Sequence, residues 1–249
     1  MQILGKTALV TGGSAGIGQH IAGQLVAQGA RVVIVARDRA RAAAFAAAHT
    51  GAITVLQADL SRSAEQDRIV AEIAGRWPEL AILVNNAGIQ TNMSDVGVGD
   101  EGRMAEFRAE IDLNLTAPIA LSFGLMPLLA GQPEAAIVNI SSGLAIAPKR
   151  TAPVYCASKA GLSAFSRALR YRCEDAAPTV QVIDVVMALV ETGMTHGRAG
   201  TKMAPADAAR AVVEGLVSGR SEVWVGRSRL LGVLHRVSPR LAFRMLRNA

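Results

Sequence analysis

The chain has 249 residues, of which 51% are hydrophobic and 18% charged. This composition supplies a sizeable core and excludes a disordered or collagen-like chain. The net charge of +6 is uneven, because six arginines and no acid lie from Arg227 onward, while the preceding 226 residues hold 20 basic and 20 acidic side chains. A neutral body with a basic tail excludes a general nucleic-acid binder.

Cysteine usage and apolar runs bear on the compartment. Two cysteines, Cys156 and Cys173, provide no disulfide framework, which favours a reducing cytoplasm. The first residues lack a basic region followed by an apolar stretch, so we expect no signal peptide. The longest apolar candidate, 117–130, contains two prolines, and we interpret it as a buried helix, not a membrane span.

Apolar runs and helical patterns alternate along the chain. The order predicts a seven-stranded, doubly wound parallel sheet with helices on both faces. We expect one domain over residues 1–226 and an extension over 227–249. The predicted strands are 7–10, 31–36, 52–57, 80–84, 135–140, 180–186 and 222–225, and the predicted helices are 17–28, 39–49, 64–76, 101–130, 154–175 and 206–218.

A glycine-rich turn joins the first strand to the first helix. A dinucleotide pyrophosphate binds at this point of a doubly wound fold, because glycines let the backbone approach it and the helix start offers free N–H groups. The spacing is Gly-x-x-x-Gly-x-Gly, which differs from the Gly-x-Gly-x-x-Gly dinucleotide fingerprint. The residues predicted to cradle the phosphates are Gly12, Ser14, Gly16, Ile17 and Gly18.

Tyr155 and Lys159 are four residues apart on a predicted helix. This spacing places both on one helix face, so both can point into one cleft. An unperturbed tyrosine has a pKa near 10 and is a poor proton donor or acceptor at neutral pH. A nearby ammonium favours the phenolate, so we expect Lys159 to lower the pKa of Tyr155 toward the working range.

The ordered set of motifs resembles the short-chain dehydrogenases/reductases over residues 3–226. Besides the glycine loop and Tyr-x-x-x-Lys, the matching elements are Asp59-Leu60, Asn85-Asn86-Ala87-Gly88, Asn114 and Ser141-Ser142. The resemblance implies a Rossmann fold and hydride transfer between a nicotinamide cofactor and a carbonyl or secondary alcohol. It implies that Ser142 orients the carbonyl, Tyr155 acts as acid or base, Lys159 holds the nicotinamide ribose, and Asn114 anchors a relay water.

The residues at the end of the second strand select the cofactor. In the family that the chain resembles, an acidic residue that selects the cofactor usually occupies the position of Ala36. Here this side chain is a methyl group, and Arg37 follows it. A guanidinium matches a 2′-phosphate, so we predict NADP(H) over NAD(H), with Asp38 and Arg39 alternatively serving as solvated charges at the helix start. By the same resemblance, further cofactor contacts are Asp59 and Leu60 at the adenine, Asn86, Ala87 and Gly88 at the adenosine ribose, and Val190 and Thr192 at the carboxamide.

Residues 189–203 contain three glycines and are predicted to form a mobile substrate lid. Met187-Ala188 stands where the family usually has Pro-Gly. We expect an apolar pocket mouth and therefore a substrate with an apolar body. The four histidines have no metal-ligand spacing, so no metal is assigned. The residues expected at the mouth are Leu144, Ile146, Ala147, Val154, Met187 and Leu189.

The tail is amphipathic. Leu230, Leu234, Val237 and Leu241 recur at helical spacing, and Ser238-Pro239 is typical of an N-cap and a helix restart. It resembles the basic tail of a family subgroup associated with teichoic-acid D-alanylation, a label that identifies no substrate. It can pack on its own body, on a partner subunit of a homodimer or homotetramer, or on anionic lipid at the inner membrane face. Two rival functions stay open: a non-catalytic NADP(H) sensor and a membrane-surface scaffold.

Overall fold

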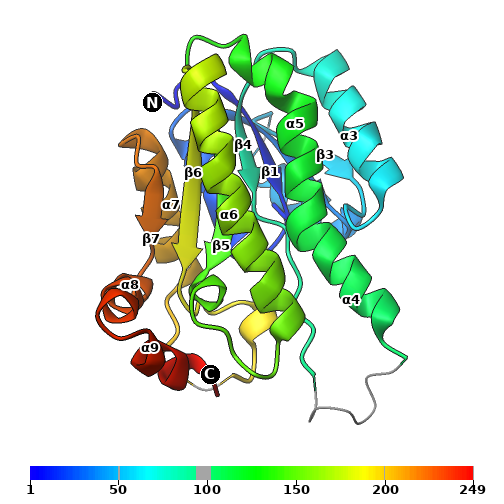
Figure 1. The fold of residues 1–249 in the computed structure, drawn as a ribbon. Helices are drawn as coiled ribbons and strands as arrows, with labels where there is room; N and C mark the ends of the chain where they lie inside the picture. Colours follow the sequence, from blue (N-terminus) through cyan, green and yellow to red (C-terminus); the bar gives the residue numbers. More distant parts are fainter. Residues whose placement is uncertain (50, 94–101, 199, 249) are drawn as a thin grey trace.

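A seven-stranded sheet organises the chain (Figure 1). The computed structural model describes residues 1–49, 51–93, 102–198 and 200–248. All strand pairs are parallel, in the order β3-β2-β1-β4-β5-β6-β7, which confirms the predicted doubly wound sheet. The strands are β1 (Thr7–Thr11), β2 (Arg31–Ala36), β3 (Ile53–Gln57), β4 (Leu80–Asn85), β5 (Ala135–Ser142), β6 (Val180–Met187) and β7 (Glu222–Trp224).

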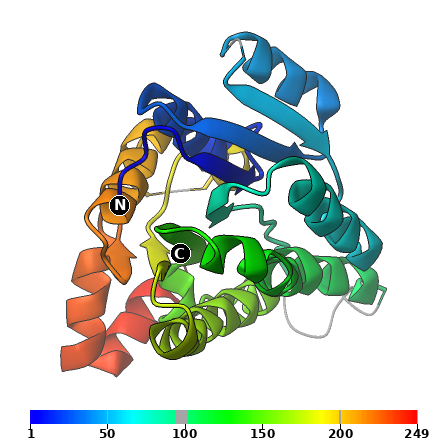
Figure 2. The same ribbon diagram turned by 90° about the horizontal axis from the view of Figure 1, so that it is seen from above.

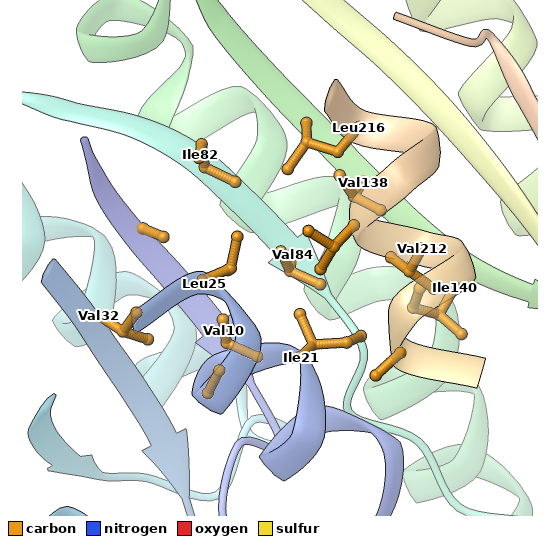
Figure 3. Packing of buried hydrophobic residues seen from close by; sticks show 14 of the residues in the cluster. Val10, Ile21, Leu25, Val32, Ile82, Val84, Val138, Ile140, Val212 and Leu216 are labelled. Carbon is orange, nitrogen blue, oxygen red and sulfur yellow. The ribbon is translucent and has the colours of Figure 1, made fainter. Parts of the chain in front are cut away.

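Helices cover both faces of the sheet (Figure 2). Side chains of a strand alternate between faces, so Ala8 and Val10 of β1 join one core cluster while Leu9 joins the other. Figure 3 shows the first cluster, in which Ile21, Leu25 and Leu216 pack on the sheet. The helices are α1 (Gly16–Ala27), α2 (Arg39–Ala47) and α7 (Pro205–Val217) on this face, and α3 (Ser63–Arg76), α4 (Met104–Ile111), α5 (Ala117–Ala130) and α6 (Pro153–Ala176) on the other.

The predicted 101–130 helix begins at Met104 and has a π-helical turn, Asp112–Thr116, between α4 and α5. Residue 101 lies outside the described residues. By length and composition Met104–Ala130 meets the criterion for a membrane span. In the fold, however, Leu121, Leu125 and Leu129 are fully buried against the sheet and its neighbouring helices. This segment therefore covers the core, as the sequence predicts for 117–130.

The strand order places a crevice beside β1. The chain steps from β1 outward to β2 and β3 on one side, and to β4 and the later strands on the other. Ligands of doubly wound sheets bind at such a switch point, outside the carboxyl ends of the strands. The glycine loop, the Asn85–Gly88 segment and Ser142 all follow or end strands at this edge.

The tail forms two helices, α8 (Ser228–Val237) and α9 (Pro239–Leu246), next to the carboxyl ends of β6 and β7 (Figure 1). The restart at Ser238-Pro239 occurs where predicted, with proline in the first turn of α9. Ser238 is the N-cap residue, as predicted, although its side chain makes no capping hydrogen bond. Proline alone fixes the start, because its missing N–H is one that a helix leaves unpaired.

Candidate active site

A cavity of about 780 Å³ lies at the carboxyl end of the sheet. It brings together residues from both halves of the chain, which no local motif could do alone. The predicted site residues that line it are Gly12, Ser14, Gly16, Ile17, Arg37, Leu60, Asn86, Ala87, Gly88, Ser142, Tyr155, Lys159, Val190 and Thr192.

The glycine loop forms one wall with a backbone that side chains would disturb. Gly12 and Gly16 have φ angles of +66° and +54°, a region that glycine tolerates best. No side chain caps the start of α1, and no acid lies in its first turn. Its free N–H groups and the helix dipole therefore suit an anion. The loop fits the pyrophosphate of a dinucleotide.

Gly18 does not line the cavity, although it was predicted to bind cofactor. A Cβ atom at Gly18 would collide with the side-chain nitrogen of Asn86 and the backbone oxygen of Gly12. The glycine is therefore needed for close packing of α1 under the loop. Its role is to place the loop, and it reaches the cofactor only through Gly12.

Thr11 and Asn86 tie the glycine loop to the segment after β4. The Thr11 hydroxyl donates to the oxygen of Val84 (3.3 Å) and accepts from the N–H groups of Asn86 (2.9 Å) and Ala87 (3.0 Å). The Asn86 amide donates to the backbone oxygens of Thr11 (2.9 Å) and Gly12 (3.4 Å). These bonds hold both sides of the crevice at a fixed separation, so the cofactor groove is formed in advance.

Cationic side chains meet at the outer end of the cavity, near the end of β2. Arg37 and Arg41 both line it. Asp38 caps α2 by accepting from the Arg41 N–H (3.0 Å), and its carboxylate lies 3.6 Å from the Arg41 guanidinium. Asp38 also lines the cavity, where its carboxylate offsets part of the positive charge of Arg41. Arg41, which the sequence analysis did not select, adds a second cation beside Arg37.

The predicted contact of Asp59 with adenine stays a prediction. Asp59 does not line the cavity, whereas its neighbours Ala58 and Leu60 do. Its Oδ1 atom accepts from the N–H (3.1 Å) and the hydroxyl (2.8 Å) of Ser61. The acid stabilises the turn after β3, and Leu60 presents an apolar side to the cavity.

Tyr155 lies on α6 with Ser142, the last residue of β5, as its hydrogen-bond partner. The phenol is 9% exposed. Burial raises the pKa of Tyr155 to about 12, and the hydrogen bond with Ser142 acts in the opposite direction. The Ser142 oxygen accepts from the Leu144 N–H (3.1 Å), so its own hydrogen stays free to be donated.

Lys159 shares the cavity with Tyr155, as predicted, but its ammonium is turned to the backbone. Its Nζ donates to the oxygen of Ile140 (2.8 Å) and lies 5.9 Å from the centroid of the Tyr155 ring. Burial lowers the pKa of Lys159 to about 8, against the attraction of Asp184 and Glu110. The expected lowering of the Tyr155 pKa by Lys159 is therefore wrong for this geometry, because burial dominates at both groups and Lys159 is not among the charges that act on the phenol.

Asn114 lies in the π-helical turn behind the cavity and is fully buried. Its amide donates to the oxygen of Ile89 (2.8 Å) and the hydroxyl of Ser158 (3.2 Å), and its oxygen accepts from the Ile89 N–H (2.9 Å). An added Cβ on Gly88 would lie 3.0 Å from the Asn114 oxygen and 3.5 Å from the Lys159 ammonium. Asn114 thus fixes the loop that runs past Lys159.

Three charged side chains near Tyr155 were not anticipated. Arg198 of the lid donates to Gln90 (2.7 Å), and its charge acts to lower the pKa of Tyr155. Lys149 is 5% exposed, and burial together with repulsion from Arg198 lowers its pKa. Glu110 is fully buried and its raised pKa follows from desolvation. These positions carry no motif, because each comes from a separate segment that only folding brings together.

Backbone hydrogen bonds join the two ends of the 189–203 segment, which is the predicted lid. The N–H of Met203 donates to Leu189 and that of Glu191 to Met203, both at 2.9 Å. Thr192 lies over the glycine loop, since a Cβ on Gly16 would come within 3.2 Å of its methyl group. Of the residues expected at an apolar mouth, Met187 lines the cavity, whereas Ala147 is buried beneath the tail, which corrects that prediction.

The described residues contain no group of three or more His, Cys, Asp or Glu side chains that could hold a metal ion.

Comparisons with known proteins agree with this geometry. The family model described as short chain dehydrogenase matches residues 6–202. An uncharacterized oxidoreductase, DltE of Bacillus subtilis, is 40% identical over 79% of this chain and 76% of its own length. A fatty acyl-CoA reductase of Acinetobacter baylyi is 30% identical over 95% of this chain and 81% of its own.

Solved structures share the fold. A short chain dehydrogenase from Burkholderia cenocepacia in complex with NADP has a TM-score of 0.86 at 24% identity, covering 99% of both chains. A short chain dehydrogenase/reductase from Burkholderia phymatum in complex with NAD has a TM-score of 0.85 at 20% identity, covering 100% of this chain and 97% of its own. The two carry different nicotinamide cofactors on one architecture.

Proposed function

The chain belongs to the short-chain dehydrogenase family and is a nicotinamide-dependent oxidoreductase; within that class, we propose that it transfers a hydride between NADP(H) and a carbonyl or secondary alcohol of an apolar substrate. One observation carries the proposal. A single cavity is lined by the glycine loop, by Arg37 at one end and by Ser142, Tyr155 and Lys159 at the other.

Tyr155 and Ser142 would handle the substrate oxygen. In reduction, the bound cofactor supplies the hydride to the carbonyl carbon. Ser142 donates to the oxygen and fixes its position, and Tyr155 gives that oxygen a proton. A pKa of about 12 keeps the phenol protonated before reaction, which suits a proton donor. In oxidation, Tyr155 must lose its proton, and the positive charge of an oxidised nicotinamide favours the phenolate.

Lys159 would hold the nicotinamide ribose and return the proton to Tyr155. Its pKa of about 8 allows it to give and take a proton near neutral pH. The Ile140 carbonyl orients the ammonium, and Asn114 holds the adjacent loop through Ile89. In this proposal Asn114 also anchors a water that links Lys159 to solvent; both side chains lie next to Gly88.

The preference for NADP(H) rests on charge at the end of β2. Arg37 and Arg41 line the cavity, Ala36 brings no carboxylate, and Asp38 is engaged at the start of α2. A 2′-phosphate adds charge that guanidinium groups bind well, whereas a ribose hydroxyl gains little from them. Both coenzymes occur among similar folds, so the arginines carry this part of the proposal.

An apolar substrate is favoured by the relative that covers almost the whole chain. That relative is named a fatty acyl-CoA reductase. Met187 and Met194 line the cavity on its open side, where a hydrocarbon could pack. We further propose a cytoplasmic homodimer or homotetramer, which mass measurement in solution would test.

Replacement of Tyr155 tests the function directly. The purified chain is given NADPH and a panel of aliphatic and aromatic aldehydes and ketones, and coenzyme oxidation is followed. Tyr155→Phe should reduce turnover by about 10²–10⁴-fold, because a proton donor is lost, with NADPH affinity retained. Tyr171→Phe is the matched control, since Tyr171 is 57% exposed on the outer side of α6 and should leave turnover unchanged.

Two results would contradict the proposal. One is a wild-type chain that binds NADPH but reduces no member of the panel, which favours a nucleotide sensor. The other is turnover that survives Tyr155→Phe.

A further inference from the structure

The tail is docked on the body by a small apolar face. Leu231 and Ala242, 4% and 0% exposed, pack on Ala147 with Leu234 and Leu246 around them. A Cβ on Gly143 would lie 3.0 Å from a methyl group of Leu231. The body of the same chain therefore covers the inner face of α8 and α9. Of the three predicted contacts of the tail, namely its own body, a partner subunit or anionic lipid, self-packing is supported for this face.

The outer face of the same two helices is apolar and exposed. Leu230, Val233 and Val237 are spaced by three, four and seven residues, which aligns them along one side of α8. On α9, Leu241 and Met245 are four residues apart. Exposed apolar residues that gather in one place mark an interaction surface. The outer face comprises Leu230, Val233, Val237, Leu241 and Met245, which are between 51% and 80% exposed.

Positive charge surrounds this outer face without compensation. The tail carries six arginines and no acid, and it accounts for the whole net charge of +6. In the part of the chain that the structure describes, none of these arginines forms an ion pair. The arginines are Arg227, Arg229, Arg236, Arg240, Arg244 and Arg247.

The exposed apolar face and the surrounding arginines together argue against a second copy of this chain as the partner that covers the face. A two-fold interface presents the same patch from both subunits, so arginines would face arginines. An anionic bilayer accepts both features at once: apolar side chains enter the boundary between headgroups and acyl chains, and guanidinium groups meet lipid phosphates. We propose that α8 and α9 form a peripheral membrane anchor that binds the surface of an anionic bilayer through this outer face.

The anchor is attached to the substrate side of the cavity. Ala147 and Gly143, on which α8 and α9 pack, follow Ser142 within five residues. The N–H of Arg150 donates to the oxygen of Arg247 (3.0 Å), a second link to the segment between Ser142 and Tyr155. Figure 1 shows both helices at the carboxyl end of the sheet, opposite the N-terminus. Given the proposed function, bilayer binding would hold the cavity near apolar substrates dissolved in lipid.

Co-sedimentation with vesicles tests the anchor without any need for turnover. The full chain is mixed with vesicles of phosphatidylglycerol and phosphatidylcholine in equal parts, and with phosphatidylcholine alone. We expect binding to the anionic vesicles, weaker at high salt and much weaker with neutral lipid. Arg236→Gln/Arg240→Gln/Arg244→Gln should lower the partition coefficient by about fivefold per arginine, or roughly a hundredfold in total.

Matched variants separate the tail from general charge and apolarity. Arg172→Gln/Arg210→Gln/Arg220→Gln removes the same charge from exposed positions of the body and should leave binding within about twofold, since surface charges away from the contact contribute little. Leu230→Ser/Val233→Ser/Val237→Ser should also lose binding, whereas Tyr171→Ser/Val217→Ser should not. Thermal unfolding confirms that each variant folds.

Specific results would overturn the anchor. The first is a wild-type chain that does not bind anionic vesicles, and the second is an equal loss of binding in both arginine triples. The third is a set of tail substitutions that change the oligomeric mass while vesicle binding persists, which would assign the outer face to a partner subunit. With an active enzyme, the tail arginine triple should slow turnover of a vesicle-dissolved ketone and not of a water-soluble one. Since sedimentation needs no substrate, a failed anchor and a failed enzyme assignment give different results.

Discussion

The cofactor end and the substrate end of the cavity are built in different ways. The cofactor end is formed mainly by backbone atoms of the glycine loop and the Asn86–Gly88 segment, which hydrogen bonds of Thr11 hold together. At the substrate end, side chains from distant segments meet: Gln90 contacts Arg198, and the tail residue Leu231 packs on Gly143. The first end depends on conformation that few residues can adopt, the second on side chains that many sequences could supply.

The difference between the two ends explains which parts of a site can be recognised as motifs in the sequence. A pyrophosphate needs free N–H groups at a fixed place, which imposes glycines at fixed spacings. A substrate pocket needs only a surface of the right shape and charge, and this can be assembled from any segments that folding brings near. We expect substitutions at the cofactor end to have larger and more uniform effects.

Among the variants compared here, the largest loss of stability should follow from Gly18→Ala. The new methyl group meets the backbone oxygen of Gly12 and the amide of Asn86, so α1 or the loop must move. Overpacking of this kind costs about 1–3 kcal/mol of the free energy of unfolding, and the displaced loop should bind NADPH at least about tenfold more weakly. Urea denaturation and coenzyme titration measure the two effects.

Gly75→Ala is the matched control for this test. Gly75 lies within α3, and a Cβ there would meet nothing within 4 Å. Alanine has the higher helix propensity, so this variant should be about 0.5–1 kcal/mol more stable, with unchanged coenzyme affinity. Normal NADPH binding by Gly18→Ala would show that the cofactor end is less constrained than its geometry indicates.

The sequence predicts the fold well, because its signals are local and repeated. Buried parallel strands produce the apolar runs, and seven of them in alternation with helices determine the sheet. The breaks inside elements were harder to foresee. Nothing in Asp112–Thr116 marks a π-helical turn, and the Ser238 hydroxyl has the chemistry of a cap that it does not form.

The site was predictable where motifs carry it. Ser142, Tyr155 and Lys159 line one cavity as expected. The electrostatics were not predictable from the sequence. The direction in which the pKa of Tyr155 shifts depends on how far burial removes water from the phenol, and the spacing of residues in the sequence does not indicate this. Arg41 and Arg198 have no sequence signal, because each is an ordinary cation until the fold places Arg41 in the cavity lining and Arg198 near Tyr155. The contact of Asp59 with adenine stays a prediction, and no motif indicates that its Oδ1 atom also accepts from Ser61.

Arg37→Ala tests the outer part of the cofactor end, and its effect should be confined to coenzyme binding. If Arg37 binds the 2′-phosphate, its loss removes charge-assisted hydrogen bonds and should raise the dissociation constant for NADPH by about 10–100-fold. The constant for NADH should change little. Arg39→Ala is the control, since Arg39 is exposed and does not line the cavity. Equal losses for both coenzymes, or none, would refute the selection of NADP(H) by Arg37.

The smallest expected effect belongs to the substrate end, and it is a shift in pH dependence. The charge of Arg198 acts to lower the pKa of Tyr155, since a nearby cation favours the phenolate. Alcohol oxidation needs the deprotonated phenol, so its rate rises with pH. Arg198→Gln raises the pKa of Tyr155 and should move this rising limb to higher pH, with little change in coenzyme affinity, as a pH–rate profile of kcat/KM would measure.

Lys202→Gln distinguishes the local charge of Arg198 from the general charge of the lid. Lys202 lies in the same lid, but its charge is not among those that act on the pKa of Tyr155. This variant should leave the limb in place. A limb that moves equally in both variants would show that the lid acts through its overall charge. An unmoved limb in Arg198→Gln would mean that this arginine does not act on Tyr155 during turnover, and the substrate end would then depend on shape alone.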